Sequence, residues 1–168
     1  MTSWASHLAL LALVAVAGLV LGDYHQGNLA RVMVLAVYAT GYNILFGYTG
    51  LLSLGHAMFF AAGLYGLGLG LRFLDFGPVT GFAAGVAAGA VLAAALGALA
   101  LRARGVGFMI VTLMFAQAVY LTILYFGEYT RGDEGFVLQP AERLLFGLPL
   151  SEADPRFWVA FVLFATAT

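Results

Sequence analysis

The side chains that could do chemistry within the apolar segments of this sequence are few and mostly neutral. His56 lies near the start of one segment, and Ser53 precedes it by three residues, a spacing that places both on one face of a helix. Asn43 lies late in the preceding segment, while Gln117 lies midway along a later one with Tyr120 about a turn further on. Polar groups inside a membrane mark functional sites by default, so these residues are the first candidates for a translocation pathway.

Enzyme and carrier chemistry is not indicated. A single histidine such as His56 is more typical of a hydrogen bond to a neighbouring helix than of a ligand or metal site. No Asp, Glu or Arg stands clearly inside an apolar segment, which disfavours a proton- or sodium-coupled carrier. Phosphate-loop, zinc-helix and nucleophile-elbow motifs are absent from the sequence, as is cysteine. We therefore expect no catalytic residue, metal or cofactor in this chain, and any energy for transport must enter through another subunit.

The composition determines the broad class of the protein. Of the 168 residues, 63% are hydrophobic and 9% are charged, and the mean hydropathy is +1.00. A soluble domain is about a quarter charged, because it must cover itself with groups that face water. The net charge of -1 gives no electrostatic case for binding nucleic acid. These values predict an integral membrane protein in contact with the lipid bilayer.

The apolar segments that must position these residues are long enough to cross a bilayer, which takes roughly 20 residues as a helix. The expected spans are Ala5–Leu21, Leu29–Phe46, Leu51–Leu71, Val79–Leu101 and Val106–Phe126, with a sixth beginning at Phe157. They are apolar on all sides, unlike the alternating strands of a membrane barrel. We predict an all-α, polytopic helical bundle forming a single transmembrane domain over residues 1–168. The first segment lacks a basic flank, so a retained helix is favoured over a cleaved signal peptide.

Small residues form a stripe along the fourth segment. They recur every four residues, at Gly81, Gly85, Gly89, Ala93 and Gly97. Small side chains let a neighbouring backbone approach closely, and this closeness stabilises helix pairs in lipid. The stripe predicts close helix packing and names no function.

The third segment is irregular. It opens with Gly47-Tyr48-Thr49-Gly50, continues through Gly55 to His56, and then contains Gly63, Gly66, Gly68 and Gly70. Each glycine weakens a helix by about 1 kcal/mol relative to alanine. A broken helix at membrane depth is tolerated where it is buried in protein or lines a cavity, as in transport pathways. We favour a place on the pathway over simple tight packing.

A polar region, Gly127–Arg156, separates the fifth span from the start of the sixth. It contains six acidic residues and three arginines: Glu128, Asp133, Glu134, Glu142, Glu152, Asp154, Arg131, Arg143 and Arg156. Pro140–Phe146 within it is expected to form a short interfacial helix. The region is either a solvated connector or a docking surface for a partner protein.

Residues 43–66, NILFGYTGLLSLGHAMFFAAGLYG, resemble the signature of branched-chain amino acid ABC transporter permeases. The family pattern is N-L-x-x-G-Y-T-G-x-x-S-L-G-H-A-x-F-x-x-x-G-A-Y. The positions that match it are Asn43, Gly47, Tyr48, Thr49, Gly50, Ser53, Leu54, Gly55, His56, Ala57, Phe59, Gly63 and Tyr65.

Further blocks follow in the family's order. Leu101–Gly105 and Phe108–Leu113 resemble L-R-x-R-G-x-Y-F-A-I-V-T-L. Thr130–Phe136 resembles T-G-G-x-x-G-L, with Arg131 in place of the first glycine and Phe136 in place of the leucine. Leu145–Ser151, followed by Phe157-Trp158, resembles the run into the next span.

The resemblance implies an importer in the bacterial inner membrane. Its pathway would contain this subunit and a second permease subunit, driven by two cytoplasmic ATPase subunits that use ATP and Mg. An extracytoplasmic substrate-binding protein would deliver an amino-acid substrate, usually leucine, isoleucine or valine, while relatives carry urea or short amides. Family members run to roughly twice this length, so the chain is expected to be the N-terminal half of a permease.

The implied sites follow the same motifs. The pathway and its gate are expected at Asn43, Gly47, Tyr48, Thr49, Gly50, Ser53, Gly55, His56 and Gln117. Binding-protein docking is expected at Arg131, Glu134 and Arg143 in the outer loop, residues 127–156. The resemblance places the N-terminus inside, although the distribution of arginines favours the reverse orientation.

The sequence leaves other functions open. A membrane scaffold without a pathway would need the glycine stripe only for packing. A secondary carrier or channel is the other alternative. An ATPase partner and a binding protein distinguish the importer from both.

Overall fold

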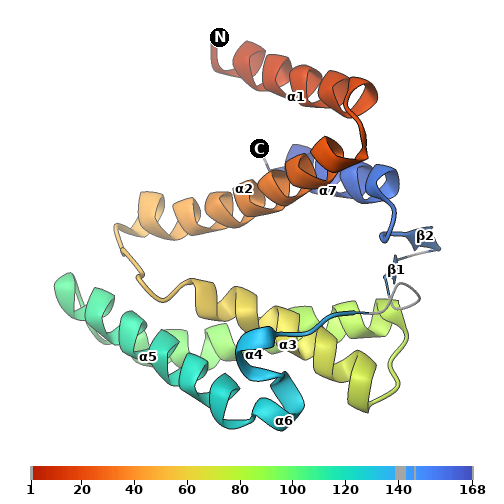
Figure 1. Cartoon of the computed structure of the whole chain (residues 1–168). Coiled ribbons are helices and arrows are strands. Elements are labelled where there is room, and N and C mark those ends of the chain that lie inside the picture. The colour runs from red at the N-terminus through yellow and green to blue at the C-terminus, as the bar shows by residue number, and fades with distance from the viewer. Residues whose placement is uncertain (1, 139–142, 146, 168) are drawn as a thin grey trace. The chain divides into compact units, whose positions relative to one another are not determined.

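The computed structural model of the chain describes residues 2–138, 143–145 and 147–167. In this part of the chain it contains seven α-helices, one 3-10 helix and two short strands (Figure 1). Their bounds are α1 Thr2–Val20, α2 Asp23–Thr49, α3 Ala57–Phe73, α4 Pro78–Ala100, α5 Val106–Tyr125, α6 Gly127–Thr130, η1 Gly132–Glu134, β1 Leu144–Leu145, β2 Leu148–Pro149 and α7 Ala153–Ala167. The predicted all-α class is confirmed.

Three of these helices, α2, α4 and α5, are long and apolar enough to cross a membrane, while α1 and α3 are shorter apolar helices. The observed bounds agree with the predicted spans most closely in α4 and α5. The largest differences are in α2, which begins six residues before Leu29, and in α3, which begins at Ala57 rather than at Leu51. The third predicted span therefore starts with a stretch that is not helical.

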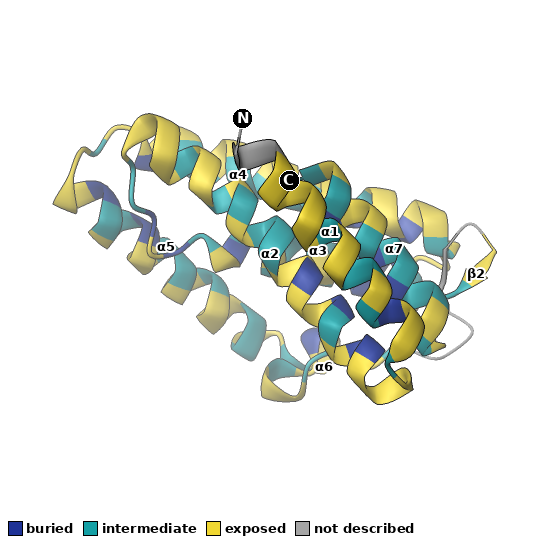
Figure 2. Ribbon diagram, turned by 90° about the horizontal axis from the view of Figure 1, so that it is seen from above, coloured by how far each residue is buried: buried dark blue, intermediate teal, exposed yellow. Residues whose placement is uncertain are grey.

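Most of the helical surface is exposed and apolar. In the most apolar windows of the three long helices, between 6% and 11% of the residues are buried, and exposed positions dominate the ribbon (Figure 2). A surface of this kind is stable against lipid or against other apolar segments rather than against water.

The chain forms two compact units, the first made of Met1–Ile44 and Gly147–Thr168. Its core is centred on the fully buried ring of Phe157 in α7, which packs with Ala30 and Met33 of α2. The Phe157 ring also lies directly against Gly18 of α1, at the place a Cβ would occupy. Glycine at this position of α1 is therefore required by the aromatic residue of α7.

The second unit, Leu45–Phe146, is organised around the antiparallel pair α3 and α4. A Cβ added at Gly85 of α4 would lie 2.6 Å from the carbonyl oxygen of Gly63, and one added at Gly66 of α3 would lie 2.6 Å from the Cβ of Ala88. At Gly89 the added atom would lie 3.3 Å from the carbonyl oxygen of Phe59. The two backbones thus approach each other more closely than side chains would allow.

The short helix expected over Pro140–Phe146 lies largely outside the described residues. Within the described part, 143–145, Leu144–Leu145 form the strand β1, so this part of the expectation is wrong. Gly147, which follows in the described chain, has a left-handed φ of 84° and lies in a turn rather than a helix.

The glycine contacts give a direct test of the α3–α4 packing. Gly85→Ala is expected to destabilise the protein by about 1–3 kcal/mol, because its Cβ overlaps a backbone oxygen. Gly97→Ala on the same helix is the matched control, because nothing lies within 4 Å of its Cβ position. Thermal unfolding of the detergent-solubilised protein measures both variants. Equal melting temperatures for the two would contradict this packing.

Candidate functional site

The predicted gate begins where α2 ends, at Gly50. This glycine has a φ of +68°, in the left-handed region, and its amide donates to the Phe46 carbonyl at 2.9 Å. The Thr49 hydroxyl donates to the Leu45 carbonyl and accepts a hydrogen bond from the amide of Leu51 at 3.4 Å. A glycine in this conformation directly after the last helical residue is a common helix stop.

The chain then leaves helical geometry for one short stretch inside the predicted third span. Residues 51–53 have no regular structure, residues 54–56 form a turn, and α3 starts at Ala57. The later glycines, at positions 63–70, lie in a continuous helix. Gly63 and Gly66 contact α4, while Gly68 contacts the ring of Phe136. The irregularity expected over the whole segment is therefore confined to its beginning.

The non-helical stretch is held against α5 by Thr112, which is 2% exposed. The amide of Leu54 donates to the Thr112 Oγ1 at 3.2 Å, and that hydroxyl donates to the carbonyl of Met109 at 3.0 Å. Gly55 lies so close to the carbonyl of Thr112 that a Cβ would overlap it, and that Cβ would also lie 3.1 Å from Ala116. Because Gly55 has no side chain, the backbone of the non-helical stretch contacts the backbone of α5 directly.

Ser53 and His56 lie in this stretch but are not on one face of a helix, because residues 51–56 are not helical. Ser53 is 5% exposed, and its Oγ has no hydrogen-bond partner among the described residues. The ring of His56 is partly buried and meets the ring of Phe59 edge-on, with centroids 5.5 Å apart.

The remaining candidates for the pathway are exposed. Asn43, Gly47 and Tyr48 lie along the last turns of α2, and Tyr48 is 86% exposed. Gln117 lies on α5, five residues after Thr112, and is also exposed. These side chains are available to lipid, to a substrate or to another membrane segment, whereas Leu54 and Gly55 lie against Thr112.

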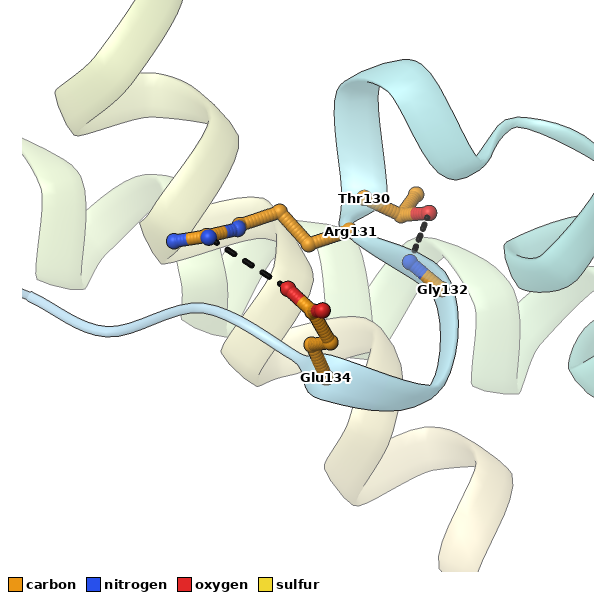
Figure 3. Close-up of polar contacts among 4 residues, drawn as sticks. All are labelled: Thr130, Arg131, Gly132 and Glu134. Atoms are coloured by element: carbon orange, nitrogen blue, oxygen red, sulfur yellow. Dashed lines mark hydrogen bonds and ion pairs between the residues drawn. The ribbon is translucent and has the colours of Figure 1, made fainter.

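The residues expected to dock a binding protein have partners of their own. Arg131 Nη2 and Glu134 Oε2 form an ion pair at 3.4 Å, with side chains 44% and 78% exposed (Figure 3). The Nε of Arg143 donates to the carbonyl of Leu138 at 3.0 Å. The opposite charges of the first pair offset each other, and an exposed pair of this kind contributes less than about 1 kcal/mol.

The connector after α5 is closed by the buried hydroxyl of Thr130. Its Oγ1 lies 2.6 Å from the Ile123 carbonyl and 3.0 Å from the Phe126 carbonyl, and it accepts the amide of Gly132 at 3.2 Å (Figure 3). Carbonyls at the end of a helix lack intrahelical partners. Thr130 supplies one for the end of α5.

Two further contacts tie the connector to the helices. The hydroxyl of Tyr120 donates to Asp133 Oδ1 at 3.0 Å. The ring of Phe136 packs on Gly68, where a Cβ would lie 2.9 Å away, and it meets the ring of Tyr65 edge-on at 5.6 Å. Phe136, which stands where the family pattern has leucine, thus fills the space that Gly68 leaves.

Sequence reasoning had assigned no role to Thr112 or Thr130. Both stand in blocks quoted for the family resemblance, and both are buried. A hydroxyl residue between apolar neighbours is a signal for Thr112 alone, because Thr130 is followed by Arg131 in the polar region. The partners, Leu54 for Thr112 and Gly132 for Thr130, depend on how the chain folds.

Comparison with known proteins extends this description. The family model described as "Branched-chain amino acid transport system / permease component" matches residues 26–168. The high-affinity branched-chain amino acid transport system permease protein LivM of Escherichia coli (strain K12) is 37% identical over 124 residues, which are 71% of this chain and 28% of that protein. LivM of Salmonella typhimurium (strain LT2) is 36% identical over 126 residues, 72% of this chain and 28% of its own length. The chain therefore spans less than a third of these relatives. No solved structure matches it.

The hydrogen bond to Thr112 is tested by paired substitutions. Thr112→Val removes the acceptor for the Leu54 amide and is expected to destabilise the protein by about 1–3 kcal/mol. Thr112→Ser keeps the hydroxyl and is expected to lose less. Thermal unfolding in detergent measures both, and a valine variant as stable as the serine variant would contradict the role of this bond.

The backbone at Arg131 gives a second test. Its φ of 62° is left-handed, and the family pattern has glycine at this position. Arg131→Gly and Arg131→Ala both remove the ion pair, but alanine retains the unfavourable conformation. The glycine variant is therefore expected to be more stable than the alanine variant by about 1 kcal/mol. Chemical or thermal denaturation measures the difference, and a more stable alanine variant would argue against a left-handed residue here.

Proposed function

The chain belongs to the branched-chain amino acid transport permease family, and from this premise we propose that it forms part of the membrane subunit of an ATP-driven importer. The observation that carries the proposal is the break between α2 and α3, which lies within the matched range and is seated on α5 through Gly55 and Thr112. Permeases of this family are membrane components rather than enzymes, so ATP and Mg are assigned to partner subunits.

The proposed substrate is leucine, isoleucine, valine or a similar small amino acid, carried across the bacterial inner membrane. The names of both LivM relatives refer to branched-chain amino acids, and this supports the assignment. Urea and short amides are the alternative substrates, since related importers carry them.

The proposed assembly contains a second permease subunit, two cytoplasmic ATPase subunits and an extracytoplasmic substrate-binding protein. The extensive exposed apolar surface of α2, α4 and α5 supports contact with further membrane segments. The connector that contains Arg131, Glu134 and Arg143 is the proposed docking surface for the binding protein, in an orientation with the N-terminus inside.

The proposed mechanism is alternating access, with residues 47–56 as part of the gate. Gly50 supplies a backbone hinge, because glycine adopts left-handed and helical conformations with similar ease. Gly55 supplies a close backbone contact that any side chain would prevent. ATP binding and hydrolysis in the partner subunits would move the helices on either side of this hinge.

The test is uptake by the complete permease, purified from its own host with the proteins that accompany it. Reconstituted into vesicles with ATP inside, it is expected to take up radiolabelled leucine. Gly55→Val is expected to lower uptake about tenfold, if an overpacking penalty of 1–2 kcal/mol falls on one gate state. Gly97→Val, at a position without close neighbours, is the matched control.

Other results of this experiment identify the alternatives. Uptake of urea or an amide without leucine uptake would identify a related importer. Uptake that ignores ATP and requires a proton gradient would identify a carrier. A purified complex that contains no ATPase and takes up no solute would favour the scaffold.

A further inference from the structure

The hydroxyl of Ser53 is the buried polar group that the described gate leaves unused. Its residue is 5% exposed, and no hydrogen-bond partner lies near its Oγ among the described residues. Most buried polar side-chain atoms have a partner, and an unsatisfied one disfavours the conformation that buries it. The described conformation of the gate therefore carries a local penalty at Ser53.

Hydroxyl residues elsewhere in this chain show where such a group finds a partner. In α2 and α5, Thr40 donates to the Ala36 carbonyl at 2.9 Å, and Thr122 donates to the Ala118 carbonyl at 2.8 Å. Thr49 makes the same bond to the carbonyl of Leu45. In these three cases the acceptor lies four residues earlier in a helix, whereas Thr112 of α5 donates to the carbonyl three residues earlier. The carbonyl four residues before Ser53 is that of Thr49, the last residue of α2.

The stretch is built so that α2 can lengthen to reach Ser53. Gly50 stops the helix by its positive φ, and glycine alone changes from this conformation to a helical one without a steric penalty. Among the described residues, the amides of Leu52 and Ser53 donate to no carbonyl in the present conformation. The Leu54 amide donates to Thr112, and this hydrogen bond would break in the longer helix.

Building on the proposed function, we infer that Ser53 controls a one-turn switch of the gate. In the second state, α2 continues through Gly50 to Ser53, and the Ser53 hydroxyl donates to the carbonyl of Thr49. Four added residues lengthen α2 by about 6 Å. Leu54 and Gly55 then leave Thr112, so the break moves toward Ala57. Ser53 is thus a positioning residue that acts on the backbone and not on the substrate.

Opposite effects on stability and transport test this inference. Ser53→Ala removes the unsatisfied hydroxyl from the described state and the hydrogen bond from the second state. In the complete permease complex, it is expected to raise the melting temperature by about 2–4 °C while lowering leucine uptake roughly fivefold. Thr122→Ala, whose hydroxyl is already bonded within a helix, is the control and is expected neither to raise the melting temperature nor to lower uptake.

Gly50→Ala provides the reciprocal test, because alanine disfavours the positive φ of the described state and favours the longer helix. The double variant Gly50→Ala/Ser53→Ala is expected to recover uptake relative to Ser53→Ala alone. Additive losses in the double variant would overturn the switch.

Hydrogen exchange separates this inference from the proposed function. In the wild-type complex, peptides that cover residues 51–53 are expected to become protected from exchange when the ATPases are trapped with ATP and vanadate. The same peptides are expected to lose that protection when the ATPases are released from the trap. Normal ATP-driven uptake with unchanged exchange in these peptides would overturn the switch and leave the importer intact. Absence of ATP-driven uptake in the wild-type protein would instead overturn the proposed function.

Discussion

The close approach of the α3 and α4 backbones is the constraint on which the second unit depends. A Cβ added at Gly66 or Gly85 would lie 2.6 Å from an atom of the opposite helix, so dispersion across this close contact replaces the hydrophobic effect that water would supply. The position of α3 in turn determines where the break before it meets α5. Phe136 of the connector then packs on the same helix at Gly68. The break before α3 and the connector are thus both positioned by one helix pair.

The first unit uses glycine differently. Gly18 of α1 accommodates the edge of the Phe157 ring, and Gly27 of α2 would place a Cβ 2.8 Å from Nη2 of Arg156. In both cases a large side chain of α7 occupies the space that the glycine leaves. Packing by a bulky residue on a small one differs from the backbone contact of α3 and α4, although composition alone does not distinguish them.

Sequence reasoning predicts the helices well because the thickness of a bilayer imposes their length and the absence of charge reveals it. It also identifies the family, since the blocks from Asn43 to Trp158 occur in a specific order, and this assignment is confirmed. It misplaces the start of α3, because apolar composition does not reveal that Leu51 and Leu52 lie outside a helix. It also assigns the break to all the glycines of the segment. The sequence does not distinguish Gly66, which allows a close contact with α4, from Gly50, which adopts a left-handed conformation. Leu54, whose amide donates to Thr112, lies 58 residues away in the chain, so this pairing becomes visible only after folding.

Because α3 is short, the depth of the break before it depends on the thickness of the surrounding bilayer. Its 17 residues span about 26 Å, less than the hydrocarbon core of roughly 30 Å, whereas its partner α4 has 23 residues and reaches about 34 Å. In a bilayer whose hydrocarbon core matches the length of α4, the residues directly before α3 therefore lie inside that core, where unpaired amides are costly. A thinner bilayer brings the same residues toward water and relieves that cost. Hydrophobic mismatch thus acts on the break itself, and the acyl-chain length of the host membrane determines how much of this segment lies in the hydrocarbon core.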